Sequence, residues 1–386
     1  MTTRASIVGV GAVGPLPPQD REGLDLGASA VLAAVADAGL ELSDVDGLVV
    51  DHGGPLGPDY DQLAQYLDLR PNSCLQTWSH GRFGAVTVQL AAMMIAAGQA
   101  GCVVCVDGYH RSGLEYGGTG WHGWIEENRT GGGPHGEDPM VGLTAPLGPA
   151  AMSARAYCEL YGVSPDELFH VVSAQRHSAS HNPHSRLRSE LDRDAYQAEP
   201  LVVEPLRRAD CAIVSEGGNA VVVTSEARAA RLDRRSVTLL ASHGIPAGRD
   251  EFFWGRPGLG MAAQTFDPRP APDYSVLRDA GLALSDVDVF YTYDAFSPLI
   301  WFGLERYGFC PPGQAPAFCA DRGIAFDGTF PVNTSGGMLC AGSPAGWGHV
   351  IEMVHQLRGE AGVRQVAGAE VAMWGSCFGD ALVMAG

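Results

Sequence analysis

Lysine is missing from this chain, because all 25 residues counted as Lys or Arg are arginine. A lysine amine forms the Schiff base in one class of aldolases, binds pyridoxal phosphate, and contacts the phosphates in P-loop phosphotransferases. The sequence therefore excludes these three reaction classes. An enzyme with this sequence must use other side chains.

Positive charge and long apolar runs are also scarce. The formal net charge is −19, which disfavours nucleic acids and anionic membranes as partners. No apolar run approaches the length of about 18 residues that spans a bilayer, and the N-terminus leads directly into a predicted strand. We expect a cytoplasmic protein with no signal peptide, no membrane insertion and no nucleic-acid partner.

The sequence offers no framework for disulfides or metal ions. Its nine cysteines lack such spacing, and the CxxC pair Cys102 and Cys105 lies inside the apolar segment CVVCV, which predicts buried thiols. His177, His181 and His184 have a spacing suited to one helix face, but a proline interrupts the helix before His184. We expect no metal site.

A glycine-rich run near the N-terminus, GVGAVG at residues 9–14, has the composition of a dinucleotide-binding loop. Prolines at positions 15, 17 and 18 follow where the phosphate-binding helix would begin, and they would break that helix. We therefore expect a strand and turn here, with no nucleotide.

The feature that organises the chain is a repeat. Residues 37–46 read DAGLELSDVD and residues 279–288 read DAGLALSDVD, so only Glu41 and Ala283 differ. Each copy predicts a helix end closed by Gly39 or Gly281, then a Ser-Asp turn and a short strand. A nearly identical segment so far along the chain indicates two copies of one α/β unit.

The two copies differ where the predicted strand ends. In the second copy, VFYTYDAF, the two-residue period of a strand places Tyr291 and Tyr293 on one face and Asp294 on the other. In the first copy, Asp51 and His52 occupy the positions that correspond to Tyr293 and Asp294. Ligands of doubly wound sheets bind beyond the carboxyl ends of strands, so the site is expected here.

Two further segments are informative. Residues 84–98 are apolar all round, which predicts a helix inside the protein, and CVVCVDG predicts a buried strand. Residues 108–150 are rich in Gly, His and Trp without a clear period, which indicates a lid or binding loop, although no role follows for the individual residues at 109–148.

Several motifs occur in the order found in one family: HNPHS, EPLRRADCAIVSEGGNAVVV, YDAFS, VNTSGGMLCAGSP and a glycine-rich C-terminal hairpin. Together they resemble the thiolase superfamily, and most closely its sterol carrier protein thiolase branch. The resemblance implies an α/β thiolase fold of two similar βαβαβαββ halves in five layers (αβαβα) with an inserted loop region. The halves would be residues 1–235, including the loop region 108–195, and residues 236–386.

The chain departs from this family at the catalytic cysteine. A thiolase carries its nucleophile at the start of the buried central helix, where the helix lowers the thiol pKa. That position falls at Gly81 here, or at Trp78 in another register. The acid/base cysteine near the C-terminus falls at Met373 or Cys377, and the sequence does not decide between them. Claisen chemistry through an acyl-cysteine is therefore not expected.

The pattern resembles the thiolase-fold aldolases of steroid side-chain degradation, which lack the cysteine, carry Tyr-Asp at the first motif and cleave β-hydroxyacyl-CoA thioesters by a retro-aldol reaction. The resemblance implies Tyr293 as the proton shuttle. A second tyrosine of that group is replaced by Ser343, in Gly342-Ser343-Pro344. Either Ser343 relays a proton through water, or Tyr291 substitutes from the same strand face.

Further residues are expected to line the substrate site. His80 would donate to the thioester oxygen beside Gly81, and the glycine-rich turns would let the backbone approach the ligand. The expected lining residues are His80, Gly81, Asp294, Asn333, Gly336, Gly337 and Gly342.

The resemblance also implies partners. It implies a homodimer, a small OB-fold or zinc-ribbon partner protein, and no cofactor besides the coenzyme A thioester of the substrate. Two other functions stay open at the level of sequence: a catalytically silent acyl-CoA-binding subunit that works with an OB-fold partner, and an acyltransferase.

Overall fold

The computed structural model describes residues 4–16, 22–51, 58–77, 84–109, 147–213, 215–244, 272–342 and 346–386. Their strands are β1 Ala5–Leu16, β2 Gly47–Asp51, β3 Ser73–Thr77, β4 Cys102–Tyr109, β5 Leu201–Val203, β6 Leu206–Arg207, β7 Glu216–Ser225, β8 Val237–His243, β9 Val289–Tyr291, β10 Val371–Gly375 and β11 Ala381–Ala385. Their helices are α1 Gly23–Asp37, α2 Tyr60–Tyr66, α3 Gly84–Ala96, α5 Leu147–Tyr161, α6 Leu168–Ser180, α7 Arg193–Ala198, α8 Glu226–Ala229, α9 Ser275–Ala280, α10 Pro298–Arg306, α11 Ala315–Arg322, α12 Gly337–Cys340 and α13 Trp347–Arg358.

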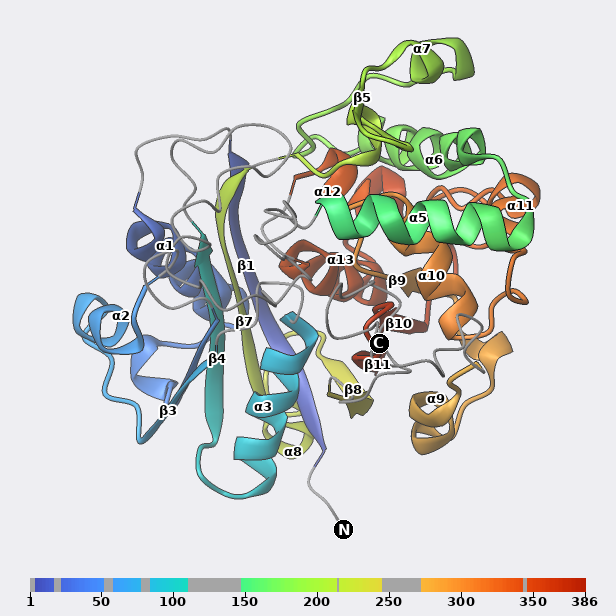
Figure 1. The fold of residues 1–386 in the computed structure, drawn as a ribbon. Coiled ribbons are helices and arrows are strands. Elements are labelled where there is room, and N and C mark those ends of the chain that lie inside the picture. The colour runs from blue at the N-terminus through green and yellow to red at the C-terminus, as the bar shows by residue number, and fades with distance from the viewer. Residues whose placement is uncertain are drawn as a thin grey trace, which may run out of the picture.

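One large mixed sheet runs through the molecule in the order β3-β2-β4-β7-β1-β8-β11-β10-β9 (Figure 1). The order reads alike outward from the central β1–β8 pair, because β7 and β11, β4 and β10, and β2 and β9 take equivalent places. An isolated parallel bridge from Phe290 to Val332 occupies the place of β3 in the second half. The mixed α/β fold with two similar halves is confirmed, while the boundary between residues 235 and 236 stays a prediction.

Both faces of the first-half strands β2 and β7 are buried. Helix α1 packs on one face of β1, β4 and β7, and α3 packs on the opposite face, beside α13 (Figure 1). Alternate strand residues belong to two different apolar clusters, Leu48 and Val50 on the α1 side and Val49 on the α3 side. The sheet therefore lies between two helical layers, as the apolar character of residues 84–98 predicted.

The GVGAVG run is part of β1, which continues to Leu16 without a phosphate loop. A Cβ atom on Gly9 would lie 2.1 Å from the carbonyl oxygen of Ala34, and one on Gly11 would lie 2.2 Å from that of Ala30. The two glycines therefore allow the backbone of α1 to lie directly against β1. Their role is close packing of helix on strand.

The repeat folds alike in both halves. Gly39 and Gly281 have left-handed backbone, with φ of 66° and 74°. The last aspartate of each copy then binds the start of the neighbouring strand: Asp46 accepts the N–H of Cys102 at 2.7 Å, and Asp288 accepts that of Val371 at 2.9 Å. The repeated sequence thus encodes a helix end, a turn and the alignment of the next strand.

Two segments fold differently from what their own sequence indicates. Residues 60–75 are typical of a short helix followed by a turn, but residues 73–77 form β3, which pairs in parallel with β2 from Gly47↔Ser73 to Asp51↔Thr77. Residues 227–235 are typical of a basic link, but they contain the end of the short helix α8. Long-range pairing with β2 decides the conformation of β3, which local propensity does not reveal. In the described ranges, no helix combines the length and the apolar character needed to cross a membrane.

We predict that Asp288→Ala lowers the free energy of unfolding by about 1–2 kcal/mol, because the side chain accepts two backbone N–H groups, from Glu370 and Val371. Glu41→Ala is the matched control, since it makes the first copy identical to the second and keeps the two hydrogen bonds that the backbone of Glu41 makes with Asp44. Its effect should stay within about 0.5 kcal/mol. Equilibrium denaturation measures both, and equal losses would contradict the assigned role.

Candidate active site

Tyr293 lies two residues beyond the end of β9 and is buried, with 8% of its surface exposed. Tyr291 is level with Trp374 of the parallel strand β10. Tyr293 is therefore level with the turn that joins β10 to β11, and its ring centroid lies 6.1 Å from that of Phe378 in this turn. The phenol is thus held at the carboxyl edge of the second-half strands.

Asn333 fixes the residue before Tyr293. Its side-chain oxygen accepts the backbone N–H of Thr292 at 2.9 Å, and its amide nitrogen donates to the Thr292 carbonyl at 3.0 Å. The amide thus replaces a neighbouring strand where β9 has ended. Asn333 is fully buried and has a φ of 51°, a left-handed conformation that Asn tolerates better than most residues. The structure therefore assigns Asn333 to holding the loop.

Asp294 fixes the residue after Tyr293. Its carboxylate is fully buried and accepts the N–H groups of Met338 at 3.0 Å and Leu339 at 3.4 Å. It also accepts the Nε2–H of His349, in α13, at 2.9 Å. These donors compensate for the loss of water around the buried carboxylate.

The turn formed by Gly336 and Gly337 requires glycine. Their φ angles are 96° and 60°, and a Cβ atom on Gly337 would lie 1.9 Å from an oxygen of Asp294. A Cβ atom on Gly336 would lie 2.6 Å from that of Ala179. The close approach predicted for these glycines thus occurs, in this structure, toward the Asp294 side chain and α6.

The EPLRRADCAI segment supports the loop from the other side. The Ala212 N–H donates to the Ala295 carbonyl at 2.9 Å, and the Ser297 hydroxyl donates to Asp210 at 2.6 Å. Asp210 also accepts the Tyr196 hydroxyl at 3.0 Å. Burial raises the pKa of Asp210 to about 6, although these hydrogen bonds lower it. Two of the motifs noted in the sequence therefore meet in space.

Tyr291 is placed differently from Tyr293. It is fully buried, and its hydroxyl is hydrogen-bonded to the Thr334 hydroxyl at 2.8 Å. Burial raises the pKa of this phenol well above its usual value, and the nearby Glu352 carboxylate adds to the rise. Its use as a second proton shuttle stays a prediction, which this geometry favours less than a role for Tyr293.

Two site residues on the first turn of α13 were not identified from the sequence. His349 binds Asp294, and the Trp347 indole N–H donates to Asp51, at the end of β2, at 3.0 Å. Asp51 also accepts the Thr77 hydroxyl at 3.0 Å. The signal in the sequence is weak, since it consists of two ring N–H donors in GWGH, residues 346–349, where α13 begins.

Some expected site residues cannot be placed. His80, Gly81 and Ser343 lie outside the described residues, as do residues 110–146 of the expected lid. Gly342 is described, with a φ of 71°, and its carbonyl accepts the hydroxyl of Ser215.

The two candidates for the position of the family's acid/base cysteine lie in different parts of the C-terminal hairpin. Met373 lies inside β10, fully buried and paired with Val383. Cys377 lies in the following turn, next to Phe378, at the edge that carries Tyr293. The turn is held by Asp380, which accepts the Trp374 indole N–H at 2.7 Å.

The histidines weighed as metal ligands make other contacts. His177 is hydrogen-bonded to Glu190 at 3.0 Å and to Asp327 at 3.2 Å. Burial lowers its pKa, but these two carboxylates raise it by more, so the net shift is upward. In the part of the chain that the structure describes, no cluster of three or more His, Cys, Asp or Glu side chains is arranged to hold a metal ion.

All nine cysteines are described and none forms a disulfide. Eight are buried, and Cys74 in β3 is half-buried. Burial raises the pKa of the Cys102 thiol to about 11. Cys102 and Cys105 are therefore buried apolar residues, as the sequence predicted.

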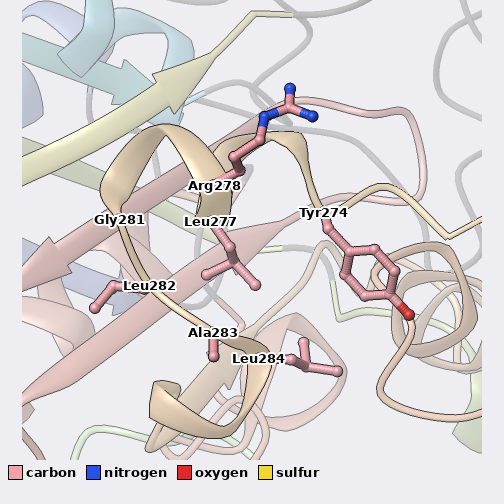
Figure 2. Close-up of a pocket in the computed structure, with 7 residues that line it drawn as sticks. All are labelled: Tyr274, Leu277, Arg278, Gly281, Leu282, Ala283 and Leu284. Atoms are coloured by element: carbon pink, nitrogen blue, oxygen red, sulfur yellow. The ribbon is translucent and has the colours of Figure 1, made fainter.

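A shallow pocket lies on α9 and the turn that follows it (Figure 2). Its lining residues are Tyr274, Leu277, Arg278, Gly281, Leu282, Ala283 and Leu284. This segment leads into the amino end of β9, whereas Tyr293 follows the carboxyl end. The pocket is therefore separate from the candidate site.

Comparisons with known proteins agree with this architecture. Residues 273–382 match the family model described as "Thiolase C-terminal domain-like". The chain is 32% identical to 17-hydroxy-3-oxo-4-pregnene-20-carboxyl-CoA lyase of Mycobacterium tuberculosis, over 96% of this chain and 95% of that protein. It is also 32% identical to the steroid side-chain-cleaving aldolase of Thermomonospora curvata, over 92% of this chain and 90% of that protein.

A solved structure described as the Ltp2-ChsH2(DUF35) aldolase superposes with a TM-score of 0.84, at 29% identity, over 99% of this chain and 98% of that chain. The similarity thus covers both halves of the sheet and the strand end that carries Tyr293. The chain belongs to the thiolase superfamily, within the group of thiolase-fold steroid side-chain aldolases.

Proposed function

We propose that this protein is a carbon–carbon lyase that cleaves a β-hydroxyacyl-CoA thioester by a retro-aldol reaction. The single observation that carries the proposal is the Tyr293 phenol, held at the strand end between two anchored residues in a member of this family. The names of the two relatives, a carboxyl-CoA lyase and a steroid side-chain-cleaving aldolase, support a steroid side-chain thioester as the substrate.

The reaction requires two proton transfers. The β-hydroxyl loses its proton as the Cα–Cβ bond breaks, which leaves a ketone and a thioester enolate, and the enolate carbon then takes up a proton. Tyr293 carries the hydroxyl proton. Ionising a phenol with a pKa of about 10 at neutral pH costs about 4 kcal/mol, which preorganised donors can offset. These steps require no lysine amine, and we propose no cofactor beyond the coenzyme A of the substrate.

Acyl transfer through cysteine is not supported by the sequence at the head of α3. Residues 78–84 read WSHGRFG and contain no thiol. In the described part of the chain, the cysteine in the turn next to Tyr293 is Cys377, which the sequence offers for the acid/base position and not for the nucleophile. A lyase uses the same thioester site without forming an acyl-enzyme.

We predict that Tyr293→Phe lowers kcat at least about 100-fold, because it removes the proton-transferring hydroxyl and keeps the ring that contacts Phe378. Tyr274→Phe is the matched control, since Tyr274 is 47% exposed and lies on the separate pocket. The assay follows ketone and shortened thioester from a tertiary β-hydroxyacyl-CoA, with and without an OB-fold partner.

Two outcomes would contradict the lyase, and a third would contradict only the role of Tyr293. Thioester binding without turnover by the unmodified protein and its partner would indicate a catalytically silent subunit. Acyl groups that stay attached after denaturation would indicate a transferase. Full activity of Tyr293→Phe would exclude Tyr293 as the proton shuttle.

The Asp294–Gly337 contact gives a second test. Gly337→Ala should lower the free energy of unfolding by about 2–3 kcal/mol and also lower kcat, because its Cβ would displace Asp294 and the loop. Gly359→Ala is the matched control, with a φ of 77° and no atom within 4 Å of the added Cβ. It should cost only the strain of about 1–2 kcal/mol and leave kcat unchanged. Equal effects on kcat would contradict the role of this contact.

We also propose a homodimer that forms through β3. This strand is the outermost of the nine-stranded sheet and pairs only with β2 among the described residues. The opposite end is extended by the bridge to Val332. Tyr66 on α2 and Leu75 on β3 are 58% and 39% exposed. An unpaired edge with exposed apolar side chains favours pairing with another chain. An OB-fold or zinc-ribbon partner is proposed as well, supported by the two-protein name of the similar structure.

We predict that Leu75→Glu raises the dissociation constant of the dimer at least about tenfold, since the substitution would bury an unpaired carboxylate. Sedimentation equilibrium measures this constant. Leu201→Glu, on the exposed ribbon strand β5, is the matched control. If Leu201→Glu dissociated the dimer and Leu75→Glu did not, the dimer interface would lie at β5 and not at β3.

A further inference from the structure

The first turn of α13 joins the two halves of the molecule through two ring N–H groups. Trp347 donates to Asp51, which ends β2, at 3.0 Å. His349 donates to Asp294, three residues beyond β9, at 2.9 Å. Strands β2 and β9 follow the two copies of the repeat, so one helical turn binds equivalent strand ends of both halves.

The hydrogen-bonding role of His349 follows from its surroundings. The side chain is 2% exposed, and its Nδ1 atom has no hydrogen-bond partner in the part of the chain that the structure describes. The centroid of its ring lies 5.5 Å from that of Trp374 and 6.2 Å from that of Tyr291. Carboxylate oxygens accept hydrogen bonds, so the contact with Asp294 requires a proton on Nε2 of His349.

The Nε2–H group of His349 binds the residue that follows Tyr293 in the chain. Asp294 is the residue next to Tyr293, and its other donors, the N–H groups of Met338 and Leu339, approach from α12. His349 is the described side chain that ties Asp294 to α13, and α13 packs on β1, β7, β8 and β10. The contact therefore fixes the position of the loop that carries Tyr293 relative to the sheet and to the first half.

We infer that His349 is a positioning residue, which sets the location of the Tyr293 phenol through Asp294. The inference rests on the proposed lyase function. His349 does not touch the substrate, because its exposed surface is almost nil. A displacement of a reacting group by about 1 Å lowers the rate about 100-fold, so loss of this N–H should appear in kcat.

Two amide substitutions separate positioning from packing. In His349→Gln, the amide nitrogen is as many bonds from Cα as Nε2 is and can donate to Asp294. In His349→Asn it is one bond shorter and cannot reach. We expect His349→Asn to lower kcat about 10- to 100-fold with KM within about threefold of the unmodified value, and His349→Gln to recover most of this loss. His355→Asn, at the far end of α13, is the control and should match the unmodified protein.

Equal decreases of kcat in His349→Asn and His349→Gln would overturn the inference. A change in KM with kcat unaltered would overturn it as well. If His349→Asn does not fold, a measurement on the unmodified protein tests the inference instead. In the ¹⁵N spectrum of histidine-labelled protein, with the His349 signal assigned by its disappearance in His349→Gln, a proton on Nε2 is expected. A ring protonated on Nδ1 alone would also overturn the inference.

Failure of the proposed function gives a different result. If the unmodified protein and its partner cleave no thioester, the lyase proposal fails, and the ¹⁵N measurement still reports the contact with Asp294. If the unmodified protein cleaves and both His349 variants match it, the lyase stands and the positioning role fails.

Discussion

The contact on which the candidate site depends is the hydrogen bond from His349 to Asp294. A fully buried carboxylate is stable only with its donors in place, and this one receives them from two helices. The same turn of α13 binds Asp51 of the first half through Trp347. The two halves of the sheet are thus held in register at the edge where the chemistry is proposed. The loop with Tyr293 has little freedom on either side, because Asn333 holds the preceding residue.

The repeat explains how two strand ends came to differ while their supports stayed the same. In both halves the glycine, the turn and the strand-capping aspartate have the same conformation and partners. Beyond the strands, the first half has Asp51, bound to an indole, and the second has a phenol between two anchors. The residues that determine the fold of the repeat are therefore the same in both halves. The two halves differ in the residues that follow the last hydrogen-bonded position of each strand.

Much of the architecture was predictable from local pattern. The repeat indicated two halves, and the apolar stretch at residues 84–98 indicated the helix α3 that packs on the sheet. Tyr293 was identified from its motif, and it lies just beyond the carboxyl end of β9. The roles of β3, Asn333 and His349 were not predictable, because each depends on a partner far along the chain. Strand β9 also ends earlier than its alternation suggested, since the Asn333 amide takes the place of a strand at Thr292.

The distribution of cysteines has a practical consequence for labelling. Eight thiols are enclosed by apolar surroundings, whereas Cys74 is half-buried on the outer strand β3. Burial raises the pKa of this thiol, and the nearby Asp61 adds to the rise, so the thiol stays mostly protonated in neutral and mildly alkaline buffer. Cys74 is therefore the cysteine most accessible to a maleimide dye in the monomer, and a dimer formed through β3 would shield it. Because residues 1–386 contain no lysine, amine-reactive reagents have no side-chain target among them.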